Sequence, residues 1–263
     1  MNPMPEQDHY WSKAAASYES EFIDPYLPDV RDNPLKRVLG KLAERGGRVV
    51  ADLGCGVGPL LPFLAERFAK VYAVDFAEGM LTRARVTAGD AENITWLRTG
   101  LADLSQIDEP LDVAVSVNSL VMPSVAEQDA VLRAIQDRLK PGGVFLGILP
   151  AMDAVHYYTM LLIDSALERG MPLETARKNA AHQAEHEFYD FAFGQFRFQG
   201  LEQHFWQPFE ARHRFRRAGF TRLRLRKVYL SWQQFSARDK LKQYDPPWDW
   251  FFLATRPLLP KPG

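Results

Sequence analysis

The feature that most constrains the fold is the stretch RVVADLGCGVG at residues 48 to 58. Its β-branched half predicts a buried strand, and its glycines at 54, 56 and 58 predict a turn in which the backbone can approach a ligand closely. Residues 59 to 68 carry a proline at the first helical position and leucines at helical spacing, so we expect a helix whose free amides face this turn. Residues 70 to 75 then predict a second, parallel strand, which completes a βαβ unit.

Two acidic residues distinguish between the cofactors that this unit can bind. Asp52 stands directly before the first glycine, where a carboxylate would repel the diphosphate of a dinucleotide but attract an ammonium group. Pro59 occupies the place of the third glycine in a dinucleotide-binding GxGxxG motif. Asp75, at the end of the second strand, is placed to accept hydrogen bonds from both hydroxyls of a ribose. A ribose joined to an amino acid ammonium describes S-adenosylmethionine (SAM).

Four motifs resemble those of class I, Rossmann-like SAM-dependent methyltransferases. They are DLGCGVG at 52 to 58, Asp75, ADL at 102 to 104 and LKPGG at 139 to 143. The resemblance implies an α/β fold with a seven-stranded, mostly parallel, doubly wound sheet and helices on both faces. In that family the seventh strand, expected here at 248 to 256, lies antiparallel between strands five and six.

Four regions are expected along the chain. Residues 1–34 form an N-terminal helical segment over the cofactor site, and 35–150 form the SAM-binding core. Residues 151–206 form a helical and aromatic lid insertion after strand five, and 207–263 return to the same core. Sequence patterns predict the first six strands at 48–53, 70–75, 93–99, 111–117, 144–149 and 218–230. They predict helices at 8–22, 35–45, 59–68, 77–88, 124–139, 153–169, 172–187 and 208–218, with Ser124 as an N-cap.

The expected cofactor site includes apolar residues that cover the strand ends. By resemblance, Trp11 and Tyr18 of the N-terminal helix are candidate walls of the SAM pocket, although ordinary helix packing explains the same pattern. Phe76 and Met80, at the mouth of the helix that follows Asp75, either pack on the purine or belong to the core.

Two further segments complete the expected cofactor site. By resemblance, Asp103 with Ala102 and Leu104 recognises the adenine edge, because a carboxylate beside an amide matches its donor and acceptor. Alternatively, Asp103 caps a short turn. Asn118, after strand four, is placed to meet the methionine part of SAM or the acceptor. The candidate cofactor residues are Trp11, Tyr18, Asp52, Gly54, Cys55, Gly56, Gly58, Asp75, Phe76, Met80, Ala102, Asp103, Leu104 and Asn118.

The insertion at 151–206 leaves the strand edge where the transferred methyl group should point. We expect it to roof the site and to supply an apolar acceptor pocket, although its aromatic residues also suit an ordinary core. If the acceptor is a hydroxyl, a base is needed, and the candidate catalytic residues are His156, Tyr158 and His186. His182 and His204 are further candidates, and each of the five also suits a structural role. No HEXXH or CXXC spacing occurs, so no metal is expected.

The balance of charge limits the partners. Lys and Arg number 32 against 33 Asp and Glu, so no overall field attracts nucleic acid or an anionic membrane. Cys55 is the only cysteine, and neither an export signal nor a membrane-spanning stretch is evident, which favours a cytoplasmic protein. The oligomeric state stays open.

These patterns favour a methyltransferase that acts on an O or N atom of a small or carrier-bound acceptor. Nucleic acid is not favoured, but the arginines within 212–227, which alternate at 222, 224 and 226, leave an RNA or protein methyltransferase open. A solvated strand face explains the same arginines. A SAM-binding protein without transfer activity is the third alternative.

Overall fold

The computed structural model of the protein describes residues 4–16, 23–198 and 201–258. Its main sheet has seven strands in the order β3-β2-β1-β4-β5-β10-β9. The first five are parallel, and β10 pairs antiparallel with both β5 and β9. The predicted fold class is therefore confirmed, including the position of the seventh strand. The strands are β1 (Val49–Leu53), β2 (Lys70–Asp75), β3 (Ile94–Arg98), β4 (Leu111–Val117), β5 (Leu139–Leu149), β9 (Thr221–Tyr229) and β10 (Trp248–Thr255).

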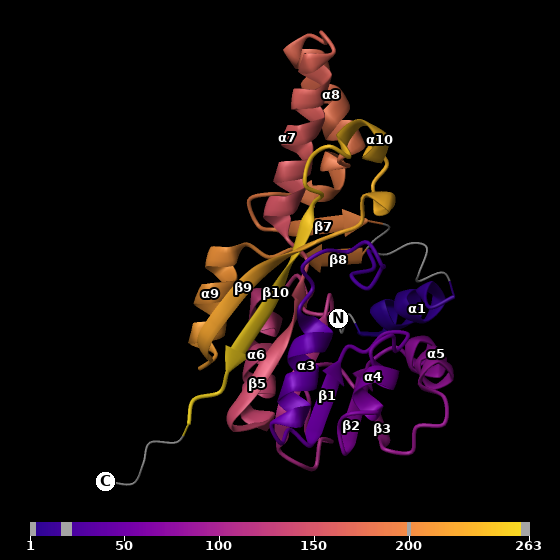
Figure 1. The fold of residues 1–263 in the computed structure, drawn as a ribbon, viewed down its shortest axis with the longest axis vertical. Helices are drawn as coiled ribbons and strands as arrows, with labels where there is room; N and C mark the ends of the chain where they lie inside the picture. The colour runs from indigo at the N-terminus through magenta and orange to yellow at the C-terminus, as the bar shows by residue number, and fades with distance from the viewer. Residues whose placement is uncertain (1–3, 17–22, 199–200, 259–263) are drawn as a thin grey trace.

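Helices cover both faces of this sheet (Figure 1). Leu35, Leu61 and Leu81 belong to one buried cluster, which places α3, α4 and α5 on one face. Ile135 and Phe215 belong to the other cluster, which places α6 and α9 on the opposite face. Parallel strands buried on both faces explain why β1 reads as an uninterrupted apolar run apart from Asp52. The helices are α1 (Met4–Ala14), α3 (Leu35–Glu44), α4 (Leu61–Ala65), α5 (Glu78–Ala88), α6 (Val125–Arg138) and α9 (Pro208–Arg217).

Several element boundaries differ from the expected ones. The helix expected at 172–187 ends at Gln183, and the strand expected at 218–230 begins at Thr221. The N-terminal helix begins at Met4 and not near residue 8, and α4 is shorter than the predicted 59–68. Strand β5 begins at Leu139, because Leu139 pairs with Leu111 and extends the ladder through the predicted loop. The predicted cap of α6 is confirmed, since the Ser124 hydroxyl accepts a hydrogen bond from the Glu127 amide.

The insertion combines a helical hairpin with a small sheet. Helices α7 (Met152–Glu168) and α8 (Leu173–Gln183) extend together away from the main sheet (Figure 1). The aromatic stretch then forms an antiparallel three-stranded sheet, which the sequence analysis did not predict. Its elements are η1 (His186–Phe188), β6 (Tyr189–Asp190), β7 (Gln195–Phe198) and β8 (Leu201–His204).

A segment between β9 and β10 packs on the insertion and not on the main sheet. It contains η2 (Trp232–Gln234) and α10 (Arg238–Leu241). Ala237 and Leu241 share a buried cluster with Leu161 of α7 and Ala180 of α8. The helical hairpin therefore has a small core of its own, to which distant parts of the chain contribute.

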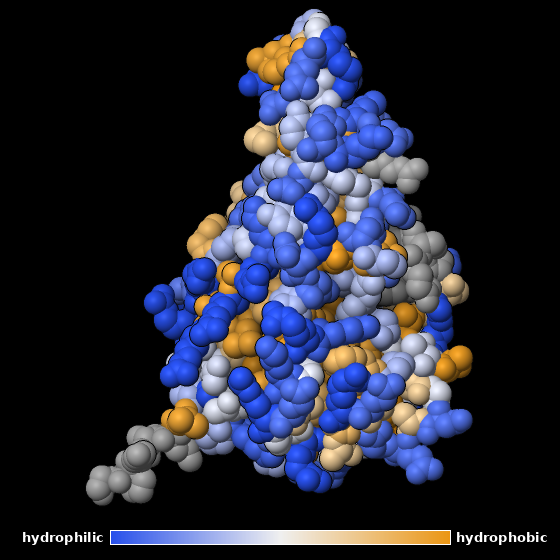
Figure 2. Space-filling model, viewed as in Figure 1, coloured by the Kyte–Doolittle hydropathy of each residue, from blue (hydrophilic) through white to orange (hydrophobic). Residues whose placement is uncertain are grey.

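The surface in the view of Figure 1 is largely hydrophilic, with an apolar group at the far end of the α7–α8 hairpin (Figure 2). Leu167 and Leu173, on either side of the turn between these helices, are exposed. Among the described residues, no helix combines the length and apolar character that crossing a membrane requires.

Candidate active site

The three glycines after β1 adopt positive φ angles for different reasons. The φ angles are +71° at Gly54, +55° at Gly56 and +80° at Gly58. A Cβ at Gly54 would lie 2.3 Å from the Cβ of Ser119, and a Cβ at Gly58 would lie 3.0 Å from Ala84. A Cβ at Gly56 would meet nothing within 4 Å. Packing inside the protein thus explains two of these glycines, whereas Gly56 faces open space where a ligand can approach.

Two buried carboxyl groups lie beside this space, Asp52 at 3% and Asp75 at 7% exposure. The Asp75 carboxyl accepts hydrogen bonds from the amides of Gly56 (3.0 Å) and Ala77 (2.9 Å). Burial raises the pKa of Asp75 despite these two bonds. Burial, and then the charge of Asp75, raises the pKa of Asp52 to about 7. A cation placed here would favour the ionised form of both groups.

An apolar cluster adjoins the carboxyl groups and brings three predicted residues together. Met80 is buried with Val57, and Trp11 and Phe76 pack against them. Helix α1 is held there because Ser12 Oγ accepts a hydrogen bond from the Gly79 amide at 3.1 Å. Tyr18, the other predicted wall, lies outside the described residues.

At the expected adenine end, Leu104 is buried, while Ala102 and Asp103 are exposed. The Asp103 carboxyl accepts a hydrogen bond from the Ser105 amide at 3.0 Å, which is the capping arrangement considered as its alternative role. Hydrogen bonding by the Ser105 side chain, and then by this amide, lowers the pKa of Asp103. Recognition of adenine by this segment stays a prediction.

A polar pair, Asn118 and Asp249, lies at the same edge of the sheet, near the ends of β4 and β5. Asn118, directly after β4, has a φ of +51°, and its amide donates to the carbonyl of Ile148. Its side-chain Nδ2 donates to Oδ2 of Asp249 at 3.2 Å. Asp249 is 5% exposed, and burial raises its pKa to about 7. Asp249 was not among the predicted site residues, although a carboxylate in the otherwise apolar stretch WDWFFLA was a usable signal.

The small sheet of the insertion is anchored at the same edge. The Trp206 indole donates to the carbonyl of Leu120 at 2.6 Å, and the amide of His204 donates to the carbonyl of Val121 at 2.7 Å. Trp206 also pairs with the chain leaving β5, through Pro150 and Met152. The insertion is thus attached to the ends of β4 and β5.

The three candidate bases lie in two different places, two of them next to Phe191 and the third in the core of the hairpin. The rings of His156 and His186 lie 4.7 and 4.8 Å from Phe191, centroid to centroid, and His186 Nε2 lies 2.8 Å from Thr159 Oγ1. Burial, and then His156, lowers the pKa of His186. Tyr158 instead lies in the core of the hairpin, next to Phe235.

The two further histidines have different surroundings. His182 is exposed near the end of α8. His204 is buried, and its Nε2 lies 2.9 Å from Glu210 Oε2. This pairing gives His204 a structural role at the start of α9.

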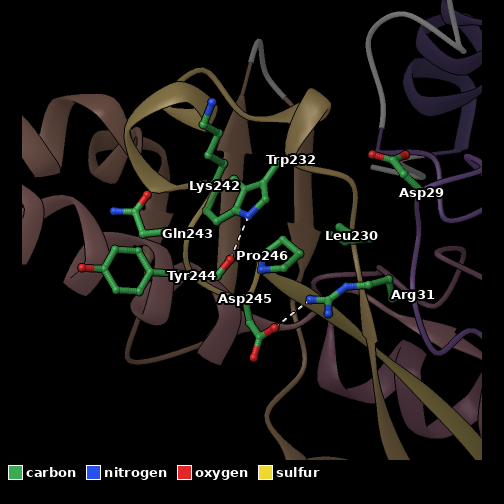
Figure 3. A pocket seen from close by; sticks show the side chains of 9 residues that line it. All are labelled: Asp29, Arg31, Leu230, Trp232, Lys242, Gln243, Tyr244, Asp245 and Pro246. Carbon is green, nitrogen blue, oxygen red and sulfur yellow. Dashed lines mark hydrogen bonds and ion pairs between the residues drawn. The ribbon is translucent and has the colours of Figure 1, made fainter.

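A separate cavity of about 430 Å³ contains none of the predicted site residues (Figure 3). Arg31 and Asp245 point toward one another across it and form an exposed ion pair of 2.7 Å. The Trp232 indole donates to the carbonyl of Tyr244 at 3.1 Å. The cavity is lined by Asp29, Arg31, Leu230, Trp232, Lys242, Gln243, Tyr244, Asp245 and Pro246.

The residues at the ends of β1 and β2 fit SAM. Open space at Gly56 permits close approach, and each Asp75 oxygen retains a lone pair for a ribose hydroxyl. Asp52 matches an ammonium group, and the cluster around Met80 matches a purine face.

Known proteins share the domain and the fold of this chain. Residues 50–143 match the model of a family described as a methyltransferase domain. The structure of the DhpI complex with S-adenosylhomocysteine (SAH) superposes with a TM-score of 0.57 at 16% identity, over 98% of each chain. Magnesium protoporphyrin IX methyltransferase from Synechocystis PCC 6803 with bound SAM gives 0.56 at 15% identity, over 97% of this chain and 98% of that one.

These similarities define the fold as that of class I methyltransferases. Residues 50–143 therefore contain a methyltransferase domain, as the motifs predict, and the chain as a whole has the fold of the class I SAM-dependent methyltransferases.

The curated relatives match over part of their length. Ubiquinone biosynthesis O-methyltransferase of Ruegeria pomeroyi is 36% identical over 109 residues, 41% of this chain and 43% of that protein. Trans-aconitate 2-methyltransferase of Deinococcus radiodurans is 29% identical over 125 residues, 47% of this chain and 46% of that protein. The chain therefore spans less than half the length of these two relatives.

Proposed function

We propose that this protein transfers the methyl group of SAM to an O or N atom of a small or carrier-bound acceptor. The observation that carries the proposal is the division of the strand edge. Gly56, Asp52 and Asp75 lie at the ends of β1 and β2. Asn118 directly follows β4 and Asp249 lies at the start of the antiparallel strand β10, beneath the attached insertion. The first half suits a cofactor, and the second suits an acceptor.

The cofactor half acts by binding and orientation. SAM supplies an activated methyl group, so the protein has mainly to align an acceptor lone pair and exclude water. Asp75 holds the ribose and Asp52 the ammonium, while Trp11, Phe76 and Met80 enclose the purine. Asp103, with Ala102 and Leu104, completes the adenine end.

The insertion supplies the acceptor half. Its attachment through Trp206 and His204 supports a role in covering the acceptor. Tyr189 stacks with Phe191 and packs beside Phe196, which supports an apolar wall. His156 and His186, whose rings both contact Phe191, are candidates to receive a proton.

The names of the relatives support a small acceptor. A ubiquinone biosynthesis O-methyltransferase and a trans-aconitate 2-methyltransferase each match part of this chain. The balanced charge of the chain also favours a small acceptor over nucleic acid.

Calorimetry and labelled SAM test the proposal. The wild type should bind SAM and SAH, and bind NAD negligibly. Asp75→Asn should weaken SAM binding by about 1–3 kcal/mol, because it loses charge-assisted hydrogen bonds while keeping the shape of the side chain. Asp112→Asn, at a carboxyl bonded to Arg48, Val49 and Lys140, is the matched control.

The location of transferred label distinguishes the alternatives. Methyl-labelled SAM is incubated with the protein and size-fractionated cell extract. Label in small molecules supports the proposal, and label in RNA or protein supports the arginine-rich strand as a docking surface. SAM binding with no label in any fraction would leave a SAM-binding protein without transfer activity.

A further inference from the structure

Asp249 is a buried carboxyl group in the acceptor half of the strand edge. Its strand, β10, begins beside the end of β5, where Trp250 pairs with Leu149. The groups that lower its pKa are the side-chain amide of Asn118 and the backbone amide of Ala151, and together they only partly offset burial. A buried carboxylate without a cationic partner is costly, so its presence at this edge calls for a reason other than stability.

Asn118 presents a second acceptor beside it. In the described part of the chain, Asn118 Oδ1 is buried and has no hydrogen-bond partner. Its Nδ2 is committed to Asp249, and its main chain is fixed by the bond to Ile148. A buried amide oxygen without a donor costs free energy unless a ligand supplies one. Asn118 Oδ1 therefore lacks a donor, and it belongs to the same side chain that donates to the Asp249 carboxyl, which can accept a further hydrogen bond.

Aromatic rings of the insertion lie next to its point of attachment at Trp206. Burial, then the charges of Glu185 and Asp249, raise the pKa of Tyr189. Tyr189 belongs to the ring cluster with Phe196 and Phe205. A molecule bound against these rings would place a polar group near Asp249.

We propose that Asp249 and Asn118 bind the reacting atom of the acceptor, which is therefore an amine nitrogen or a hydroxyl oxygen that carries a proton. In the transfer, the lone pair of that atom forms the new bond to the methyl carbon. The bond from carbon to sulfur breaks, and its electron pair stays on sulfur as the sulfonium becomes a thioether. The proton of the acceptor passes to the Asp249 carboxylate. This inference rests on the proposed function.

Four ring compounds of similar size test the proposal: benzylamine, phenol, benzoate and toluene. Each is titrated into the full-length protein saturated with SAH, and binding is followed by ligand-observed NMR. Benzylamine and phenol should bind the wild type more tightly than benzoate and toluene, and Asp249→Asn should weaken them about tenfold. Asp153→Asn is the matched control, because that carboxyl accepts a bond from the Trp250 indole and makes none to Asn118.

The outcomes separate this inference from the function on which it rests. If wild-type protein fails to bind SAH by calorimetry, the proposed function is wrong. If SAH binds and benzoate competes equally with benzylamine, or no probe distinguishes wild type from Asp249→Asn, the role of Asp249 is wrong and the function stands. A labelled product methylated on carbon would also overturn the inference, since such an acceptor presents no proton-bearing heteroatom.

Discussion

The indole nitrogen of Trp206 donates a hydrogen bond of 2.6 Å to the carbonyl oxygen of Leu120. This bond joins residues 86 positions apart and ties the end of the insertion to the loop that follows β4. Trp206 and Leu120 are each 1% exposed, so bulk water does not reach this bond.

Trp206→Phe should therefore lower the free energy of unfolding by about 2–4 kcal/mol, because it leaves a buried carbonyl without a donor and a small void. Urea unfolding measures the loss. The exposed Phe193→Leu variant should differ little from the wild type. A stable Trp206→Phe protein with unchanged unfolding would show that the insertion is held by other contacts.

Substitutions in the glycine turn should separate effects on stability from effects on SAM binding. Gly54→Ala should destabilise the protein by about 2 kcal/mol or more, since its Cβ would overlap Ser119 and its φ is positive. Gly56→Ala should cost only about 1 kcal/mol in stability, yet weaken SAM binding.

Thermal unfolding and calorimetry on the same samples measure the two effects. Adding Ser119→Gly to Gly54→Ala should recover part of the lost stability, because it removes the overlapping atoms. If Gly56→Ala binds SAM as tightly as the wild type, the open space beside Gly56 is not the cofactor site.

The pKa of Asp52 near 7 predicts that SAM binding depends on pH. An ammonium group beside Asp52 favours the carboxylate, so binding should release protons near neutral pH and strengthen as the pH rises from about 6 to about 8. Titrations in two buffers of different ionisation enthalpy measure the released protons.

Methylthioadenosine, which lacks the amino acid part of SAM, is the control ligand, and its binding should release no protons. Equal proton release by both ligands would assign the titration to a group outside the ammonium pocket.

Asp249 predicts a pH dependence of stability in the unliganded protein. The pKa of the Asp249 carboxyl rises from 3.8 in the unfolded chain to about 7 in the folded protein, so the folded protein holds this proton more tightly. The stability gained in this way is fully present below pH 3.8 and is lost as the pH rises to and through about 7. The urea midpoint should fall between about pH 5.5 and about pH 8.

Asp249→Asn should flatten this fall, whereas the exposed Asp103→Asn should leave its slope in this range unchanged. Asp52 contributes in the same direction, so a residual slope is expected. A slope that is identical in the wild type and Asp249→Asn would show that Asp249 titrates alike in the folded and unfolded chain.

Local patterns predicted much of the fold. The run at 48–53 marked β1, Ser124 marked the start of α6, and alternation along β9 correctly separated exposed Arg224 from partly buried Leu225. These features depend on residues that are neighbours in the sequence, so a single sequence is enough to predict them.

Features that depend on distant residues were not predicted. The carboxyl of Asp249 meets Asn118 across 131 positions, and no local pattern encodes that contact. The difference between Gly54 and Gly56 arises from Ser119, which comes from another loop. The aromatic residues at 188–206 were equally compatible with a core, a lid or a sheet. Only the pairing of β6, β7 and β8 in the structure shows that they form a sheet.

Strand β9 lies at one edge of the main sheet, where it pairs only with β10 for most of its length. Backbone groups along such an edge can add a strand from a second molecule and start aggregation. Arg222, Arg224 and Arg226 are exposed there, so two copies that met edge to edge would bring six guanidinium groups together. Repulsion among these guanidinium groups disfavours edge-to-edge pairing of two copies, independently of any part that the arginines play in recognition.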